Sequence, residues 1–221
     1  MLTNAQIKLV KSLATKKGRL ESGFCLVEGA KVIETAGDAV DFTFTREDSF
    51  EYEKLVTTET PQEIAGVARI PKFEIDDIKS SKTIVVLDGV QDPGNVGAIL
   101  RLCLGFNASL LLIESADTTS PKVVRSSSGA IFLVPWMNVA RDKAESTIKN
   151  LKRDIFRLEI TDSALTLDAI ETNEPAVIIA GSEGSGIKLE IEAPSVKISH
   201  STKIESLNVA NALAIALHAR N

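Results

Sequence analysis

The sequence predicts an α/β protein in two parts, the second of which holds a parallel sheet covered by helices on both faces. One observation is a set of continuous apolar runs, typical of strands buried on both faces, at residues 83–90, 109–113, 176–180 and 196–198. A second is that helical patterns lie between these runs, an alternation that favours a parallel sheet. A third is the polar stretch EIDDIKSSK at residues 74–82, which separates this pattern from the shorter elements before it.

The first part is expected to be a compact α/β domain of residues 1–78, followed by a second domain of residues 79–221. Its predicted elements are a helix from Asn4 to Lys17, a strand from Phe24 to Glu28, a helix from Ala30 to Ala36, a strand from Asp41 to Thr45, a helical turn from Pro61 to Ala65 and a strand from Val67 to Ile70. Apolar residues at helical spacing predict the first helix, and Gly18 is expected to end it.

The composition limits the class of protein. The 221 residues are 44% hydrophobic and 25% charged, and no apolar run is long enough to span a bilayer. The N-terminus lacks the apolar core and cleavage site of a secretory signal, so a cytoplasmic location is expected. Cys25 and Cys103 are too few and too far apart to predict a disulfide framework or a zinc site. We therefore expect no bound metal and no membrane attachment.

Basic residues gather at the N-terminus although the net charge of the chain is -5. Residues 1–20 contain no acid and carry Lys8, Lys11, Lys16, Lys17 and Arg19. A helix with this charge could follow RNA phosphates, and it could equally be a solvated surface.

Polar loops follow three of the predicted strands, where open α/β sheets bind ligands. The first, DGVQDPGNVG at residues 88–97, contains Asn95 and leads into a helix with Arg101. The second, GSEGSG at residues 181–186, has neither the dinucleotide nor the P-loop glycine spacing, which disfavours a nicotinamide-dependent oxidoreductase. The third, residues 206–209, precedes an alanine-rich helix whose small residues predict packing on several sides, for example at a subunit interface.

Together these loops resemble the three signature motifs of the SpoU/TrmH branch of the SPOUT superfamily, which contains RNA 2'-O-methyltransferases. The similar segments are LDGVQDPGNVGAILR, IIAGSEGSGI and IESLNVANALAIAL, within residues 82–220. Between the first two, SPKVVRSSSGAIFLVPW is similar to a family segment that here carries Arg125, Ser126, Ser128 and Gly129. In the first part, FCLVEGAKVIETA is similar to the L30e-like substrate-binding domain that precedes many SpoU enzymes.

The resemblance implies a trefoil-knotted α/β catalytic domain, a homodimer formed through the knot region, S-adenosylmethionine as the cofactor and structured RNA as the partner, with rRNA favoured over tRNA. The cofactor would be bound by Gly181, Gly184, Gly186, Ile198 and Leu207. The implied catalytic set is Arg101, Asn95, Glu183, Ser206 and Asn208, in which Arg101 positions the ribose or its phosphate and the others orient the ribose and the loops. Arg125 joins the basic N-terminal residues as an implied RNA contact.

One segment departs from the family pattern. The family has Ile-Pro-Met before the third motif, whereas this chain has Ile198-Ser199-His200, which makes His200 a polar replacement at the edge of the cofactor pocket. The alternatives are a tRNA 2'-O-methyltransferase and a catalytically weak RNA-binding or ribosome-assembly factor with the same fold. Retention of the implied catalytic set argues against the weak factor, because a pure binding protein has no need of it.

Overall fold

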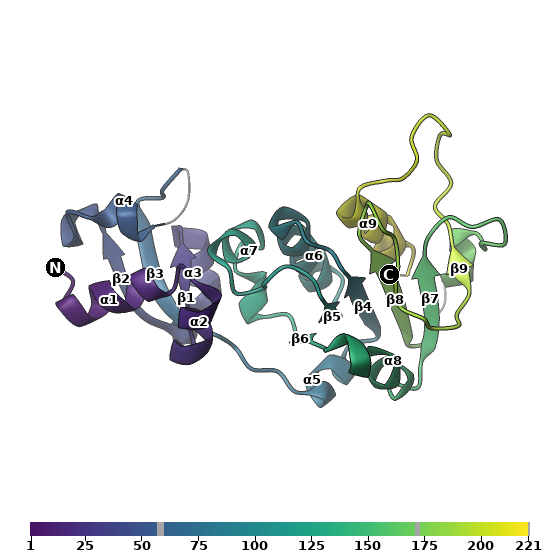
Figure 1. Cartoon of the computed structure of the whole chain (residues 1–221), viewed down its shortest axis with the longest axis horizontal. Helices are drawn as coiled ribbons and strands as arrows, with labels where there is room; N and C mark the ends of the chain where they lie inside the picture. The colour runs from purple at the N-terminus through teal and green to yellow at the C-terminus, as the bar shows by residue number, and fades with distance from the viewer. Residues whose placement is uncertain (57–59, 171–172, 221) are drawn as a thin grey trace. The chain divides into compact units, whose positions relative to one another are not determined.

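The computed structural model describes residues 1–56, 60–170 and 173–220, which divide into two compact units (Figure 1). The first unit is residues 1–72 together with residues 117–133, and the second is residues 73–116 together with residues 134–221. The segment 117–133 therefore packs with the first unit although it follows strands of the second. The boundary between residues 78 and 79 stays a prediction.

The first unit is a three-stranded antiparallel sheet flanked by short helices. Its strands are β1 (Phe24–Glu28), β2 (Val40–Thr45) and β3 (Ile64–Arg69), in the order β1-β3-β2. Its α-helices are α1 (Asn4–Ser12), α2 (Lys16–Ser22), α3 (Ala30–Ala36), α4 (Tyr52–Leu55) and α7 (Pro121–Ser126), and η1 (Gly37–Ala39), η2 (Arg46–Asp48) and η3 (Ala130–Phe132) are 3-10 turns. A core around Leu13, Phe44 and Tyr52 holds these elements together.

Two predictions for this unit are wrong. The helix expected from Asn4 to Lys17 is divided into α1 and α2, because the Thr15 side chain caps a new helix by accepting a hydrogen bond from the Gly18 backbone N–H at 3.1 Å. The helical turn expected from Pro61 to Ala65 is absent, and Ile64 begins strand β3 instead. A strand forms here instead of a helical turn because it places Ala65 and Val67, which are fully buried, in the core beneath the sheet.

Arg19 is buried inside the first unit, with 3% of its surface exposed. Its guanidinium donates hydrogen bonds to the Leu13 carbonyl at 2.7 Å, to Thr119 Oγ1 at 3.1 Å and to Asp117 Oδ2 at 2.6 Å. Burial raises the pKa of Asp117, but hydrogen bonds from Arg19 and Thr119 outweigh it and hold that pKa below its ordinary value. Arg19 is therefore a structural residue that joins segment 117–133 to α2, which corrects its prediction as an RNA contact.

The second unit confirms the predicted parallel sheet. Six strands lie in the order β6-β5-β4-β8-β7-β9, all paired in parallel. They are β4 (Thr83–Asp88), β5 (Ala108–Ile113), β6 (Trp136–Asn138), β7 (Asp154–Leu158), β8 (Ala176–Gly181) and β9 (Ser195–Val196). Strands β6 and β7 were not predicted, because the first has only three residues and the second contains Asp154 and Arg157 and so lacks a continuous apolar run.

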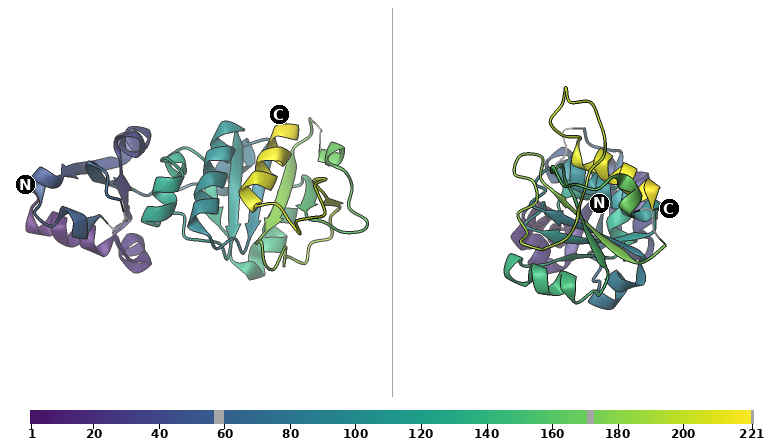
Figure 2. Two further views of the ribbon diagram at one scale, coloured as in Figure 1. Left: turned by 90° about the horizontal axis from the view of Figure 1, so that it is seen from above. Right: turned by 90° about the vertical axis from the view of Figure 1, so that its right-hand side faces the viewer.

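Helices cover both faces of this sheet, as Figure 2 shows. They are α5 (Ile75–Ser80), α6 (Pro93–Gly105), α8 (Arg141–Lys149) and α9 (Val209–Ala219), with the 3-10 turn η4 (Leu167–Ile170). Ile78 of α5 and Ile148 of α8 pack in one core with Val86 and Leu111 of the sheet, while α6 and α9 pack against each other on the opposite face. Among the described residues, no helix is long and apolar enough to cross a membrane.

Strand register places the functional loops at one edge of the sheet. Asp88, the last residue of β4, lies beside Ile113 of β5 and Gly181 of β8. Because all three strands run the same way, the loops that follow them emerge at the same level. The knotted threading of the C-terminal segment, which the family resemblance implies, stays a prediction.

The Arg19→Met substitution tests the structural role of this arginine. It removes the cation and leaves the half-buried carboxylate of Asp117 without its main partner, so we expect the free energy of unfolding to fall by about 3–5 kcal/mol. Because the pKa of Asp117 is lowered by folding, this contribution is present at neutral pH and is lost as the pH falls below about 4. Urea denaturation followed by circular dichroism at both pH values checks the effect.

Lys17→Met is the matched control, because Lys17 lies on the same helix and its side chain is 83% exposed in an ion pair with Glu21. We expect a change below about 1 kcal/mol. Equal destabilisation by the two substitutions would contradict the assigned role of Arg19.

Candidate functional site

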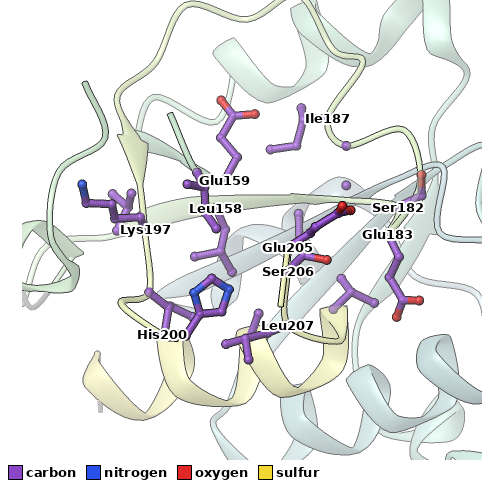
Figure 3. Close-up of a pocket in the computed structure, with 18 residues that line it drawn as sticks. Leu158, Glu159, Ser182, Glu183, Ile187, Lys197, His200, Glu205, Ser206 and Leu207 are labelled. Carbon is purple, nitrogen blue, oxygen red and sulfur yellow. The ribbon is translucent and has the colours of Figure 1, made fainter. Parts of the chain in front are cut away.

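A cavity of about 330 Å³ opens in the second unit where β7, β8 and β9 end (Figure 3). Of the residues predicted to bind a cofactor, Gly181, Gly186, Ile198 and Leu207 line it, together with Ser206 of the predicted catalytic set. Gly184 does not line this cavity. Four separate segments of the chain thus form one pocket, and the sequence had indicated three of them. The fourth, residues 158–160 at the end of β7, was not predicted.

The glycine loop after β8 folds back tightly on itself. Gly186 has a φ of +64°, and its N–H donates a hydrogen bond to the Ser182 carbonyl at 2.9 Å. A Cβ atom at Gly181 would lie 2.1 Å from the Gly186 carbonyl carbon, far inside van der Waals contact. Only glycine fits at position 181, because the backbone of residues 186 and 187 lies directly against it.

A buried carboxylate holds this loop in place. Asp88 is 1% exposed, and its Oδ2 accepts hydrogen bonds from the backbone N–H groups of Lys188 at 2.5 Å and Leu189 at 2.7 Å. Its Oδ1 accepts a hydrogen bond from Arg141 Nη2 at 2.7 Å, and Arg141 Nε donates to Glu114 Oε2 at 2.6 Å. The hydrogen bond to Asp88 raises the pKa of Arg141, which stays charged.

Sequence reasoning missed this network. Asp88 ends an otherwise apolar strand, and an acid in such a place is a usable signal, because a buried carboxylate requires partners. No pattern around Arg141 distinguishes it from other surface arginines.

Three predicted residues form one hydrogen-bonded cluster. Asn208 Nδ2 donates to Glu183 Oε1 at 2.8 Å and to Asn95 Oδ1 at 2.9 Å, and Asn95 Nδ2 donates to Glu183 Oε1 at 3.2 Å. They come from α6, from the glycine loop and from the start of α9, where the Asn208 side chain also caps the helix. The structure thus brings Asn95, Glu183 and Asn208 together, while their catalytic roles stay predictions.

The remaining predicted residues lie elsewhere. Arg101 is exposed on α6 and does not line the cavity. In the first unit, Lys8, Lys16 and Lys17 are exposed, Lys11 forms an ion pair with Glu51 at 2.7 Å, and Arg125 donates hydrogen bonds to the carbonyl and hydroxyl oxygens of Thr60 at 3.0 and 3.1 Å. Of the set predicted to bind RNA, Lys8, Lys11, Lys16 and Lys17 are exposed, Arg125 is partly exposed, and Arg19 is buried.

The cavity wall combines apolar and acidic groups. Glu159, Glu183 and Glu205 line it, together with Lys197 and His200 (Figure 3). Burial raises the pKa of Glu159, but hydrogen bonds from Arg157 and Ser195 outweigh it and hold that pKa below its ordinary value, so the carboxylate is ionised. His200 lines the cavity, and its role stays a prediction. Within the described parts of the chain, no group of three His, Cys, Asp or Glu side chains could hold a metal ion.

Asp88→Asn tests the buried network. An amide keeps the size of the side chain but turns one oxygen into a donor that faces other donors, so we expect the free energy of unfolding to fall by about 3 kcal/mol. Asp76→Asn is the control, because that side chain is 91% exposed, and it should change stability by less than about 0.5 kcal/mol. Chemical denaturation of both variants measures the difference, and wild-type stability of Asp88→Asn would refute the role.

Comparison with known proteins identifies both parts of the chain. Residues 82–218 match the SpoU rRNA Methylase family, and residues 4–45 match the MRM3-like substrate binding domain. The first match covers more than half of the chain. The second confirms that a substrate-binding domain precedes the catalytic domain.

Relatives extend these matches over almost the whole chain. A 23S rRNA (guanosine(2553)-2'-O)-methyltransferase of Bacillus subtilis is 28% identical over 97% of this chain and 95% of the relative. A 23S rRNA (adenosine(1067)-2'-O)-methyltransferase of Streptomyces azureus is 32% identical over 78% of this chain and 67% of the relative. An AdoMet-bound rRNA methyltransferase from Sinorhizobium meliloti shares the fold, with a TM-score of 0.84 at 23% identity over 100% of this chain and 95% of that one. This chain belongs to the SpoU rRNA methylase family.

Proposed function

We propose that this chain transfers a methyl group from S-adenosylmethionine to a ribose 2'-hydroxyl of ribosomal RNA. The observation that carries the proposal is the cluster of Asn95, Glu183 and Asn208 beside a cavity formed by the glycine loop, Ile198 and Leu207. The two curated relatives are named as 23S rRNA 2'-O-methyltransferases, which favours rRNA over tRNA as the substrate class.

The cavity residues fit S-adenosylmethionine. Leu158, Ile187 and Leu207 offer apolar contact to a flat base, and the backbone of the glycine loop offers hydrogen-bonding groups. Carboxylates in the wall suit a ligand with a positive sulfonium and an ammonium group, and they would repel a phosphate. When bound, this cofactor supplies a methyl group on a good leaving group, so the protein has mainly to align the reactants.

The other predicted catalytic side chains orient the substrate and stabilise charge. Glu183 accepts hydrogen bonds from both asparagines, and this fixes the orientation of all three groups at the cavity. The Ser206 hydroxyl lines the same cavity and can contact the ribose. Arg101 positions the ribose or its phosphate through its fixed charge; an arginine is a poor proton acceptor at neutral pH, so charge stabilisation is its role.

RNA binding and assembly complete the proposal. Lys8, Lys11, Lys16 and Lys17, together with Arg125, contact phosphates of structured RNA from the substrate-binding domain. Two copies form a homodimer through the knot region, where α6 and α9 pack, and the partner copy completes the surroundings of Arg101. The enzyme works in the cytoplasm, where ribosomal RNA is modified.

Gly181→Ala tests the cofactor cavity. The added methyl group cannot fit against the backbone of residues 186 and 187, so the loop must move, and we expect affinity for S-adenosylmethionine to fall at least tenfold by calorimetry. Gly184→Ala is the matched control in the same loop, because no atom lies within 4 Å of the added methyl group. Loss of affinity in both variants would mean that Gly184 contacts the cofactor after all.

Methyl transfer itself is tested with labelled S-adenosylmethionine and ribosomal RNA from cells that lack the gene. We expect label in a 2'-O-methylated nucleotide with the wild-type protein, and a rate about 100-fold lower with Arg101→Ala at unchanged cofactor affinity. Cofactor binding without transfer to any cellular RNA would refute the proposed function. Transfer by Arg101→Ala at the wild-type rate would refute only the role of this arginine.

A further inference from the structure

A second cavity, of about 430 Å³, lies beside the first in the same unit. It is lined by Gly89, Val90, Gln91, Asp92, Asn95, Glu114, Arg141, Ser182, Glu183, Ser185, Lys188 and Val209. None of the residues predicted to bind the cofactor is among them. The second cavity is therefore distinct from the predicted cofactor-binding residues.

The two cavities share part of their walls. Ser182, Glu183 and Val209 line both, and Asn95 of the polar cluster lines the second. Methyl transfer requires the acceptor oxygen to approach the donor in line, at close range and without intervening water. With the donor in the first cavity, an acceptor in the second would meet it at the shared wall.

The charge of the second cavity decides which part of a nucleotide can enter. Asp92, Glu114 and Glu183 oppose Arg141 and Lys188, so the acidic groups outnumber the basic ones. The buried carboxylate of Asp88 lies behind Arg141 and cancels part of its charge. A phosphate would be repelled here, whereas a neutral ribose and base can use the carboxylates as hydrogen-bond acceptors.

The Arg141 guanidinium keeps N–H donors that can bind this ligand. Its Nε is used by Glu114 and one N–H of Nη2 by Asp88, which hold the guanidinium in a fixed orientation. Among the described residues, Nη1 has no hydrogen-bond partner, and the side chain is 31% exposed. A guanidinium fixed on one side and free on the other is suited to bind an oxygen or ring nitrogen of a ligand.

We propose that the second cavity receives the ribose and base of the acceptor nucleotide, and that Arg141 binds this nucleoside through Nη1 while the flanking phosphates stay outside. This inference rests on the proposed function and deepens it. It makes Arg141 a substrate-binding residue in addition to its contact with the loop-holding carboxylate of Asp88. Glu114 then serves as the group that aims the guanidinium into the cavity.

Arg141→Lys is the principal test, because an amine can still pair with Asp88 but has no equivalent of Nη1. We measure binding of ribosomal RNA from cells without the gene, with S-adenosylhomocysteine in the first cavity, at several salt concentrations. The dissociation constant for RNA should rise about tenfold, as expected for one lost charge-assisted hydrogen bond. In Arg141→Gln, which removes the charge, the slope of the logarithm of the dissociation constant against the logarithm of salt should stay unchanged, because no phosphate contact is lost. Affinity for S-adenosylhomocysteine should change less than twofold.

Lys143→Gln is the matched control on the same helix, where Lys143 is exposed, and it should leave RNA affinity as it is.

Unchanged RNA affinity in Arg141→Lys would overturn the inference. A salt slope reduced by about 0.7 to 0.9 in Arg141→Gln would also overturn it, since that would mean a phosphate contact. A parallel loss of S-adenosylhomocysteine affinity would show that Arg141 only supports the loop. If the wild-type protein binds RNA but transfers no methyl group, the proposed function fails whatever Arg141 does.

Discussion

The functional edge of the second unit depends on one buried carboxylate. Asp88 ends the strand that lies between β5 and β8, and it binds two backbone N–H groups after the glycine loop as well as Arg141 at the start of α8. A buried charge of this kind is stable only when every partner is in place, so it selects a single arrangement of these segments. Glu183 lines both cavities, so the shape of each cavity depends on this arrangement of segments.

Local charge, rather than the net charge of -5, explains how an acidic protein handles RNA. The exposed lysines of α1 and α2 carry positive charge at the surface of the first unit, whereas carboxylates line the two cavities. On the proposed function, repulsion keeps the phosphate backbone at the rim of the cavities, where contacts position the RNA without entering the site. This proposal assigns affinity and chemistry to separate surfaces.

Much of the fold and site followed from the sequence. The four apolar runs overlap β4, β5, β8 and β9, because buried parallel strands are local patterns. The three loops after them are joined by hydrogen bonds among Asn95, Glu183 and Asn208. The short strand β6 and the polar strand β7 were missed, since their pairing with neighbours rather than their composition makes them strands. Arg19 was assigned to RNA because a basic cluster at the N-terminus does not reveal that one member is buried.

The sequence by itself determined the parallel sheet and the loops that contain Asn95, Glu183 and Asn208, because each depends on neighbouring residues or on a motif of fixed spacing. That segment 117–133 packs with the first unit did not follow from the sequence. The tertiary structure alone decided which charges are paired inside. Arg19 meets Asp117 98 positions away, and Asp88 meets Arg141 53 positions away and the Lys188 N–H 100 positions away. Such pairings depend on how distant segments pack, and the cost of burying an unpaired charge then selects them.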